Sequence, residues 1–305
     1  MIGKGEFNMC KKALDHFITL KEYISEKEYK EIIQLEELCN LKDKTNLKLE
    51  LDYKLNICKN SDKGLKNINE FLYYVDNVLV AYLGISSFGG NIGEINGMTH
   101  PDWRRKGLFK KLFELAVDEC KNERFNKLLL LSDGKSNSGI EFIKAMGGKY
   151  DFSEYRMELL NKISSENVNS INLRKADKSD AKEIARQDAI FFNDTEESES
   201  FLMEDELPNQ VSYMIELNDK IIGKIKIEYI DNLAFIFGFG ILPDFRGNGY
   251  GKAALKEAIN LINRKGIYNI ELDVECKNNT ALTLYKACGF EGKSVMNYYK
   301  YSIEF

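Results

Sequence analysis

The sequence predicts an α/β protein with two similar domains in tandem, each a mixed β-sheet flanked by helices. Three observations support this prediction. Apolar runs typical of strands alternate with amphipathic helical segments along the 305 residues. A glycine-rich loop, Arg246-Gly247-Asn248-Gly249-Tyr250-Gly251, follows an apolar run that ends at Ile241-Leu242-Pro243. A weaker copy of this region lies 142 residues earlier (246 − 104).

The repeat keeps one register without a gap from the turn at Asp76-Asn77 to Gly147. The matching pairs are Pro101 and Pro243, Arg104 and Arg246, Gly107 and Gly249, and Gly147 and Gly289. A fixed register of this length implies two copies of one fold. Because the period has the size of a domain, we expect two tandem domains rather than a solenoid.

The length of the chain also favours two domains, each large enough to bury its own core. Between the two copies, Asn161–Asn169 is rich in Ser and Asn and has no apolar periodicity, which predicts a linker. We therefore place an N-terminal domain at 9–160, a linker at 161–170 and a C-terminal domain at 171–305.

The elements of the first half begin with a capping box. Ser25 and Glu28 form an S-x-x-E pattern that predicts the start of a helix reaching about Leu41. Alternation over Leu47–Leu55 predicts a strand, and Asp76-Asn77 predicts a hairpin turn. The other elements predicted here are the hairpin strands Phe71–Val75 and Val78–Ile85, strand Ile95–Thr99, helix Gly107–Lys121, strand Lys127–Ser132, helix Ser138–Met146 and strand Tyr150–Leu159.

The second half repeats this plan. Its predicted elements are strand Ile171–Lys175, helix Ser179–Phe191, hairpin strands Val211–Leu217 and Lys220–Ile230, strand Leu233–Leu242, helix Gly249–Arg264, strand Asn269–Glu275, helix Asn279–Cys288 and a terminal strand pair. The helix after the glycine-rich loop carries apolar residues at helical spacing, which predicts one buried face.

Bulk properties narrow the class of protein. The net charge of −5 disfavours a general nucleic-acid binder, which needs a basic face. Six cysteines occur without a C-x-x-C pair or nearby histidines, so we expect neither a metal site nor a disulfide framework, and a cytoplasmic location. The longest apolar run, Ala234–Leu242, is too short to span a membrane, and Asp15-His16 interrupts the apolar stretch near the N-terminus, so we expect no signal peptide.

The loop from Arg246 to Gly251 has the features of a diphosphate site. It joins a strand to a helix, so the unpaired N–H groups and the positive end of the helix dipole point at one place. Glycines at 249 and 251 let a ligand approach the backbone closely. An ordinary glycine-rich turn is the alternative for the hexapeptide taken alone, and the repeat argues against it.

The second half resembles a GCN5-related N-acetyltransferase (GNAT) over nearly all of 171–305. The resemblance is carried by Leu173–Ala181, by Ile241-x-Pro243-x-x-Arg246-x-x-Gly249-x-Gly251, and by Asn278-x-x-Ala281-x-x-Leu284-Tyr285-x-x-x-Gly289-Phe290. The first half is similar but degenerate, with Phe109 in the place of Gly251 and Ser136 in the place of Asn278. The chain is thus identified as a tandem member of this family.

The resemblance implies a mixed sheet of six or seven strands in each domain, splayed between its fourth and fifth strands, with acetyl-CoA as co-substrate in the gap. The pyrophosphate would lie on the glycine loop, and pantetheine would pair with the strand ending at Ile241. The cofactor-binding residues that the resemblance implies are Ile241, Leu242, Arg246, Gly247, Asn248, Gly249, Tyr250, Gly251, Lys252 and Asn278.

Two further residues are candidates for the chemistry of acetyl transfer. Tyr285, in the family's leucine-tyrosine position, is the candidate general acid for the departing thiolate; the alternative is a core aromatic residue. Asp273 lies on an alternating strand, Ile270–Glu275, at the place where related ribosomal-protein acetyltransferases carry a catalytic carboxylate. We expect it to act as the base through a water molecule. A solvated strand face is the alternative, and Glu228 is the reserve candidate.

The first half lacks both groups, because Leu131 and Ile143 occupy the corresponding positions. Its loop Arg104-Arg105-Lys106-Gly107 keeps three cations, so CoA binding there stays open. We expect this domain to have a structural role or to complete the acceptor site. His100, beside Pro101, is expected to be a loop residue rather than a base.

Together these features predict an acetyl-CoA-dependent N-acetyltransferase. A primary amine would attack the thioester directly, and this chemistry would take place in the C-terminal domain. Seven carboxylates between Asp194 and Glu206 would favour a small cationic amine as acceptor; a solvated helix face is the alternative. A protein N-terminal or lysine acetyltransferase and a non-enzymatic acyl-CoA sensor are the alternative functions. The sequence identifies neither the acceptor nor the oligomeric state.

Overall fold

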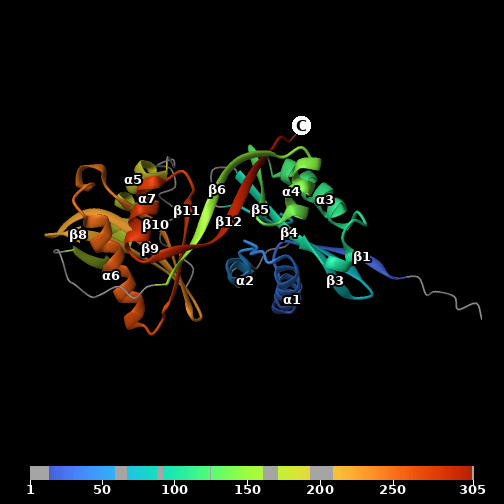
Figure 1. Cartoon of the computed structure of the whole chain (residues 1–305), viewed down its shortest axis with the longest axis horizontal. Helices are drawn as coiled ribbons and strands as arrows, with labels where there is room; N and C mark the ends of the chain where they lie inside the picture. Colours follow the sequence, from blue (N-terminus) through green and yellow to red (C-terminus); the bar gives the residue numbers. More distant parts are fainter. Residues whose placement is uncertain are drawn as a thin grey trace, which may run out of the picture. The chain divides into compact units, whose positions relative to one another are not determined.

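The structure is a computed structural model that describes residues 14–58, 67–87, 92–123, 125–160, 171–192 and 209–303. The chain divides into two compact units, coloured along the sequence in Figure 1. The first comprises Met1–Ser87, Gly93–Asn126 and Ile303–Phe305, and the second comprises Phe88–Ile92 and Lys127–Ser302.

The first unit contains an antiparallel sheet in the order β1-β2-β3-β4. Its elements are β1 (His16–Lys21), α1 (Glu26–Asp43), α2 (Leu51–Cys58), β2 (Glu70–Val75), β3 (Val78–Ser86), β4 (Ile92–Thr99), the single turn η1 (Pro101–Trp103) and α3 (Leu108–Asn122). The capping box predicted at the start of α1 is present, because Ser25 accepts from the Glu28 N–H and Glu28 accepts from the Ser25 N–H. Apolar residues of α1 and α2 pack on β2 and β3 to form a core.

The second unit contains a mixed sheet in the order β5-β12-β6-β11-β10-β9-β8-β7. Its elements are β5 (Lys127–Asp133), α4 (Asn137–Ala145), β6 (Lys149–Leu159), β7 (Ile171–Lys175), η2 (Lys178–Asp180), α5 (Ala181–Phe192), β8 (Gln210–Leu217), β9 (Lys220–Ile230), β10 (Leu233–Ile241), η4 (Pro243–Phe245), α6 (Tyr250–Arg264), β11 (Asn269–Glu275), α7 (Asn279–Ala287) and β12 (Phe290–Tyr301). Helices α6 and α7 pack on one face of β8–β11 and form its main core.

The last strands of the two repeats are exchanged. In Figure 1, β6 runs beside β12, and the two strands pair antiparallel along most of their length. β6 also pairs with β11 of the second repeat, while β12 pairs with β5 of the first. Among the residues that the structure describes, each repeat supplies six strands, and the sheet of the second repeat gains a seventh because β6 is inserted between β11 and β12.

This exchange has an internal two-fold relation. Glu154 and Met296 lie directly opposite each other, and they are related by the repeat itself (296 − 154 = 142). In the flanking ladders, Asp273 lies opposite Arg156. Their counterparts in the other repeat, Leu131 for Asp273 and Tyr298 for Arg156, also lie opposite each other. The repeat predicted from the sequence therefore extends to the pairing of the strands.

The repeat is also visible in the local geometry of the loops before α3 and α6. These helices begin after Gly107 and Gly249, which have φ of 78° and 81°. In both copies the arginine Nε of the loop donates to the carbonyl that ends the preceding strand, Arg104 to Thr99 and Arg246 to Ile241. The sequence prediction of two copies of one fold is confirmed.

Two predicted elements are wrong. The segment Leu47–Leu55 was expected to be a strand, but helix α2 begins at Leu51. Leu51 and Lys54 are both buried, and their spacing of three suits a helix that packs one face against a sheet, whereas a short apolar run fits either period. The expected terminal strand pair is one strand, β12, because its partners are the distant strands β5 and β6.

The compact units do not coincide with the predicted domains 9–160 and 171–305. Strands β5 and β6 of the first repeat belong to the second unit, because their pairing with β12 and β11 joins them to it. The predicted linker 161–170 lies outside the described residues. The proposed domain limits, which follow the repeats, remain a prediction.

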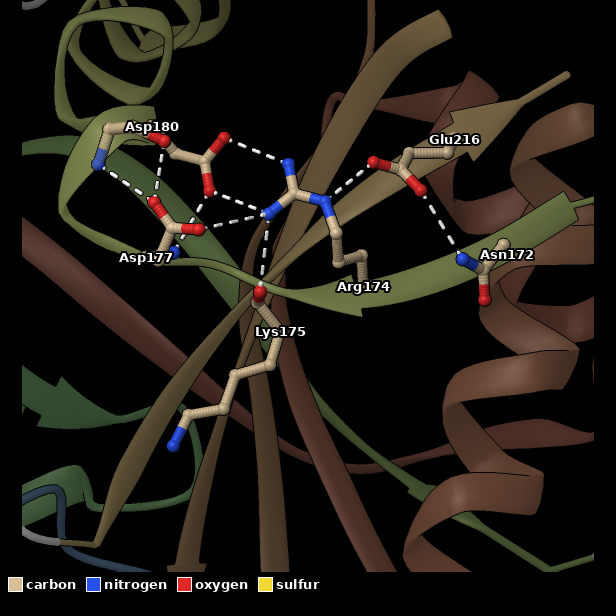
Figure 2. Close-up of polar contacts among 7 residues, drawn as sticks. Asn172, Arg174, Lys175, Asp177, Asp180 and Glu216 are labelled. Atoms are coloured by element: carbon tan, nitrogen blue, oxygen red, sulfur yellow. Dashed lines mark hydrogen bonds and ion pairs between the residues drawn. The ribbon is translucent and has the colours of Figure 1, made fainter. Parts of the chain in front are cut away.

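The segment Leu173–Ala181, part of the resemblance, has a structural role in the second repeat. Figure 2 shows the Arg174 guanidinium between Asp180, to which it donates two hydrogen bonds of 2.9 Å, and Glu216, to which Nε donates one of 2.6 Å. Asp180 also accepts from the Asp177 backbone N–H. These contacts tie β7 to β8 and to the start of α5.

Candidate active site

The sheet of the second repeat opens between β10 and β11. The two strands pair in parallel only from Leu233 to Ile236, opposite Asn269–Leu272. Beyond that point β10 follows β9 to Ile241, while β11 follows β6 to Glu275. The edge of β10 from Phe237 onward therefore does not pair with β11, as expected for a splay between the fourth and fifth strands. Backbone groups along such an edge are available to a ligand.

A β-bulge lies at the start of this opening. The register of β10 against β9 shifts by one residue between Phe237 and Gly240, and Gly238 has φ of 56°. Gly223 of β9 lies against the Gly240 carbonyl so closely that a Cβ atom would overlap it. A bulge re-aims backbone groups at the place where it occurs.

The glycine loop stands at the end of β10. Gly247 and Gly249 have φ of 79° and 81°, and an added Cβ at either position would meet no atom within 4 Å. Helix α6 begins at Tyr250 without a side-chain cap at Gly249. The first-turn N–H groups of such a helix have no intrahelical partner, so the loop is suited to an anion such as a diphosphate.

Two predicted cofactor residues also hold the loop in shape. Arg246 Nε donates to the Ile241 carbonyl at 2.7 Å. The Asn248 amide donates to the Arg246 carbonyl at 3.1 Å. Leu242 is buried and its N–H donates to the Ile222 carbonyl, whereas Lys252 on the first turn of α6 is exposed.

The two predicted glycines differ in what a side chain would meet. At Gly249 the positive φ is itself unfavourable for other residues. At Gly251 the Cβ direction points inward, where Leu284 Cδ2, Ile241 Cγ1 and the Phe239 ring lie at 3.5, 3.6 and 4.0 Å. A large residue at 251 would therefore crowd the wall between β10 and α7 rather than the phosphate cradle, which corrects our interpretation of this position.

Tyr285 lies on α7 within the core that α6 and α7 form against the sheet. Its ring meets Phe290 edge-on with centroids 6.1 Å apart. Burial raises the pKa of Tyr285 to about 12, so the hydroxyl keeps its proton. Asn278 caps the same helix through its side-chain oxygen, which accepts from the Ala281 N–H at 3.1 Å.

Asp273 is held by an arginine of the first repeat. Arg156 on β6 donates from Nε and Nη2 to the two carboxylate oxygens of Asp273 at 2.6 and 2.9 Å. Such a bidentate pair fixes the carboxylate and favours its ionised form. Arg156 also packs over the Phe235 ring at 4.8 Å. Sequence reasoning missed Arg156, because its partnership depends on the exchange of β6.

The neighbouring carboxylates of this face are also paired. Glu271, two residues before Asp273, binds Lys293 at 2.6 Å and lies 3.6 Å from Arg156. Glu228 on β9, the reserve candidate, lies opposite Phe235 and accepts from the Asn209 amide at 3.1 Å. The structure thus places Asp273 and Glu228 on strands that flank β10.

A buried ion pair lies beside the bulge. Lys224 of β9 is 1% exposed, lies opposite Gly240, and binds Asp188 of α5 at 2.6 Å. Phe191 of the same helix packs on Gly240, where a Cβ atom would overlap its ring. No pattern in the sequence predicts this pair. The carboxylates predicted to attract the acceptor, Asp194–Glu206, lie outside the described residues.

The first repeat differs at each of these places. β4 pairs with β3 from Ala81 to Ser86 in a constant register, so the bulge is absent there. Phe109, the counterpart of Gly251, extends its ring toward Gly97, where an added Cβ would lie 2.8 Å from it. Leu131 and Ile143 are both buried apolar residues.

Two of the three cations of the first-repeat loop contact neighbouring side chains. Arg104 makes two hydrogen bonds to Asp43, of 2.9 and 2.6 Å. Lys106 lies 4.2 Å from the centroid of the Trp103 ring. His100 caps the turn η1 by accepting from the Asp102 N–H, which places it in the loop as expected.

Comparison with known proteins agrees with this geometry. Residues 31–147 and 179–290 match the Acetyltransferase (GNAT) family. An uncharacterized N-acetyltransferase, YycN, of Bacillus subtilis (strain 168) is 34% identical over 96 residues, which are 30% of this chain and 62% of that protein. The [ribosomal protein bS18]-alanine N-acetyltransferase of Escherichia coli (strain K12) is 26% identical over 90 residues, 29% of this chain and 61% of that protein. The matches thus span about three fifths of each relative.

Two solved structures resemble the whole chain in fold. A GCN5-related N-acetyltransferase from Sphaerobacter thermophilus has a TM-score of 0.75 at 17% identity, with 95% of this chain and 96% of that chain covered. A tandem GNAT protein from the clavulanic acid biosynthesis pathway has a TM-score of 0.71 at 10% identity, with 95% and 99% covered. The chain belongs to the GNAT acetyltransferase family and carries two copies of its fold.

Proposed function

We propose that the chain is an acetyl-CoA-dependent N-acetyltransferase whose second repeat acetylates a primary amine. One observation carries this proposal. The second repeat combines a bulged, splayed strand, an uncapped glycine loop and the hydroxyl group of the buried residue Tyr285, whereas the first repeat has an unbulged β4 and Ile143 in the place of Tyr285.

The residues of the loop fit the co-substrate. The open space over Gly247 and Gly249 leaves room for a diphosphate, which would accept from the first-turn N–H groups of α6. The free edge of β10 up to Ile241 would pair with the amide groups of pantetheine. Asn278 lies at the start of α7, which follows β11 in the chain. Acetyl-CoA, when bound, supplies the acetyl group as a thioester.

Tyr285 would act as proton donor. Its raised pKa keeps the hydroxyl protonated at every physiological pH, so the donor is always in the required form. An ordinary thiol has a pKa of about 8.5, so full transfer to a free thiolate would be uphill. We therefore assign to Tyr285 a hydrogen bond to the sulfur as the C–S bond breaks; when its proton moves to the sulfur, the tyrosine oxygen regains one from water, while the amine proton passes to Asp273.

Asp273 would take the amine proton through a water molecule. The two hydrogen bonds from Arg156 fix the orientation of this carboxylate, so that a water molecule could be held between it and the amine. Because Arg156 comes from β6, the first repeat contributes a residue that positions this candidate base. That contribution agrees with a supporting role for the first repeat.

A small cationic amine is the proposed acceptor. The second candidate is the N-terminus of a protein, which is favoured by the likeness to the ribosomal-protein alanine acetyltransferase. We expect the protein to work in a reducing cytoplasm, where the cysteines that the structure describes would stay unpaired.

A thiol-release assay tests the proposal. Purified protein is supplied with acetyl-CoA and, in separate reactions, with diamines, aminosugars and peptides that begin with alanine. Turnover with amines and not with peptides supports the first acceptor class, and the reverse supports the second. Binding of acetyl-CoA without turnover of any acceptor would overturn the proposal.

A further inference from the structure

A cavity of about 190 Å³ opens in the first compact unit. It lies between the end of β1, the start of α2, the strand ends at Glu70 and Ile85, and Glu123 just beyond α3. The loop at Arg104 precedes the other end of α3, a helix of 15 residues. At about 1.5 Å per residue the helix separates the two places by roughly 20 Å, so the cavity is distinct from the first repeat's counterpart of the cofactor loop.

The floor of the cavity is a buried charged cluster. Lys54 Nζ lies 2.9 Å from Glu70 Oε1, and the Tyr82 hydroxyl donates to Glu70 Oε2 at 2.5 Å. Lys54 also donates to the Tyr82 oxygen at 3.2 Å. All three residues are almost fully buried, and a Cβ atom at Gly84 would overlap the Lys54 and Tyr82 head groups. A buried ion pair persists only where hydrogen bonds satisfy it, as they do here.

The wall of the cavity adds negative charge. Lys54 is already offset by Glu70, and the lining also contains Glu123. Glu123 Oε1 is a buried atom with no hydrogen-bond partner among the described residues. A buried carboxylate oxygen without a donor is costly, so this atom is placed to receive a donor from a ligand.

The rest of the lining suits an amine. Asn67, Asn69, Ser86 and Ser87 supply polar side chains, and Tyr23 and Tyr53 supply aromatic ones. Ammonium groups bind carboxylates and the faces of aromatic rings. The volume is below that of pockets for drug-sized ligands, which measure about 300–1,000 Å³. No group of three metal-binding side chains occurs in the part of the chain that the structure describes, which favours an organic cation.

We propose that this cavity binds a small organic cation, a primary ammonium on a short aliphatic chain, with its ammonium group at Glu123. The site lies in the first repeat and is independent of the proposed acetyl transfer in the second. It gives the degenerate repeat a binding function of its own.

The cavity makes binding depend on pH. Burial, with repulsion from Glu119 and Glu22, raises the pKa of Glu123 to about 7. Of the other charged groups that face the cavity, Lys54 and Glu70 neutralise each other. An alkylammonium stays charged up to a pKa of about 10.4, so the ligand keeps its charge between pH 6 and 8 while Glu123 ionises. Affinity should therefore rise about tenfold over that range as the carboxylate ionises.

Calorimetry on the full chain tests the proposal, with 1,4-diaminobutane and n-butylamine as probes and without acetyl-CoA. Glu123→Gln keeps the shape and removes the charge, and should raise the Kd at least tenfold and abolish its pH dependence. The matched control is Glu114→Gln, because Glu114 lies on the same helix with a side chain 61% exposed, and should leave the Kd unchanged.

The outcomes distinguish this site from an acceptor site in the second repeat. An amine bound there would be insensitive to Glu123→Gln, so equal Kd values in both variants and the wild type would overturn the proposal. No binding of either probe would overturn it too. If Glu123→Gln does not fold, the wild type decides, since an affinity independent of pH between 6 and 8 contradicts a role for Glu123.

Discussion

At the scale of single residues, Tyr285 and Asp273 differ in their hydrogen bonding. Asp273 has both carboxylate oxygens bound by Arg156, whereas the Tyr285 hydroxyl has no hydrogen-bond partner in the described part of the chain. The pKa of Tyr285 is raised by burial alone. A donor that is held in place without a competing acceptor is available to a ligand.

We expect Tyr285→Phe to lower kcat by roughly 10²–10⁴, the range for loss of a general acid. The phenyl ring keeps the packing on Phe290, so Tm and the Kd for acetyl-CoA should stay near wild type. Because the hydroxyl keeps its proton up to a pKa of about 12, the wild-type kcat should show no fall between pH 8 and 10 from this group. An unchanged kcat in steady-state assays would exclude Tyr285 as the donor.

Substitutions of Asp273 and Arg156 distinguish two roles for Asp273, that of a catalytic base and that of a structural anchor for Arg156. Asp273→Asn and Arg156→Met should both lower Tm, because each leaves a half-buried charged group without its bidentate partner. Asp273→Asn should also lower kcat at least 100-fold, as expected for loss of a base, whereas Arg156→Met keeps the carboxylate and should lower kcat less. Glu271→Gln is the control, since Glu271 lies on the same strand and is bound by Lys293. Wild-type kcat in Asp273→Asn would leave the anchor as its sole role.

At the scale of elements, the two glycine loops have almost the same backbone but different neighbours. Both begin their helix after a glycine of positive φ, and both use an arginine to bind the end of the preceding strand. A phenylalanine and a glycine change places between the two repeats. The second has Phe239 on the strand and Gly251 on the helix, whereas the first has Gly97 and Phe109.

The different positions of the phenylalanine and the glycine in the two repeats predict that each chain binds one molecule of acetyl-CoA. In the second repeat Gly251→Ala should bind normally, because its Cβ would make ordinary contacts at 3.5 Å or more. Gly251→Val should raise the Kd at least tenfold and also lower Tm, because its branches would press on Leu284 and on Ile241, at the end of the strand proposed to pair with pantetheine. Calorimetry measures both. A second bound equivalent that survives Gly251→Val would place a functional CoA site in the first repeat.

The sequence predicted the elements that depend on local signals. The hairpin turns Asp76-Asn77 and Asn218-Asp219 adopt positive φ at both residues, and the capping box at Ser25 is formed. The strand predicted at Leu47–Leu55 failed because a short apolar run fits two periods. Arg156 and Lys224 could not be found, because their partners are 117 residues away in one case and on a packed helix in the other.

At the scale of the whole chain, the exchange of β6 and β12 joins the repeats more firmly than a linker would. Both neighbours of β12 come from the first repeat, and β11 is completed by β6. A sequence cannot readily predict such pairing, since the strands that meet are far apart and each would also suit the edge of its own sheet. The activity proposed for the second repeat therefore depends on strands of the first.

The division of labour can be tested in the intact chain. Asp273→Asn combined with Tyr285→Phe should remove nearly all turnover, because Leu131 and Ile143 of the first repeat cannot move protons. The thiol-release assay measures this, with retained binding of acetyl-CoA as the control for folding. Turnover near the wild-type rate would assign the chemistry to the first repeat.

Fragments test the strand exchange itself. A fragment 171–305 lacks β5 and β6, so β12 has neither of its partners and the edge of β11 is uncovered. Exposed strand edges promote aggregation, so we expect it to be insoluble or to melt without cooperativity. A fragment 127–302 keeps the eight strands that the structure describes over 127–302, and it should melt cooperatively and bind acetyl-CoA within a few-fold of the full chain. Circular dichroism and calorimetry decide; cooperative melting and full affinity of 171–305 would show that the exchange is dispensable.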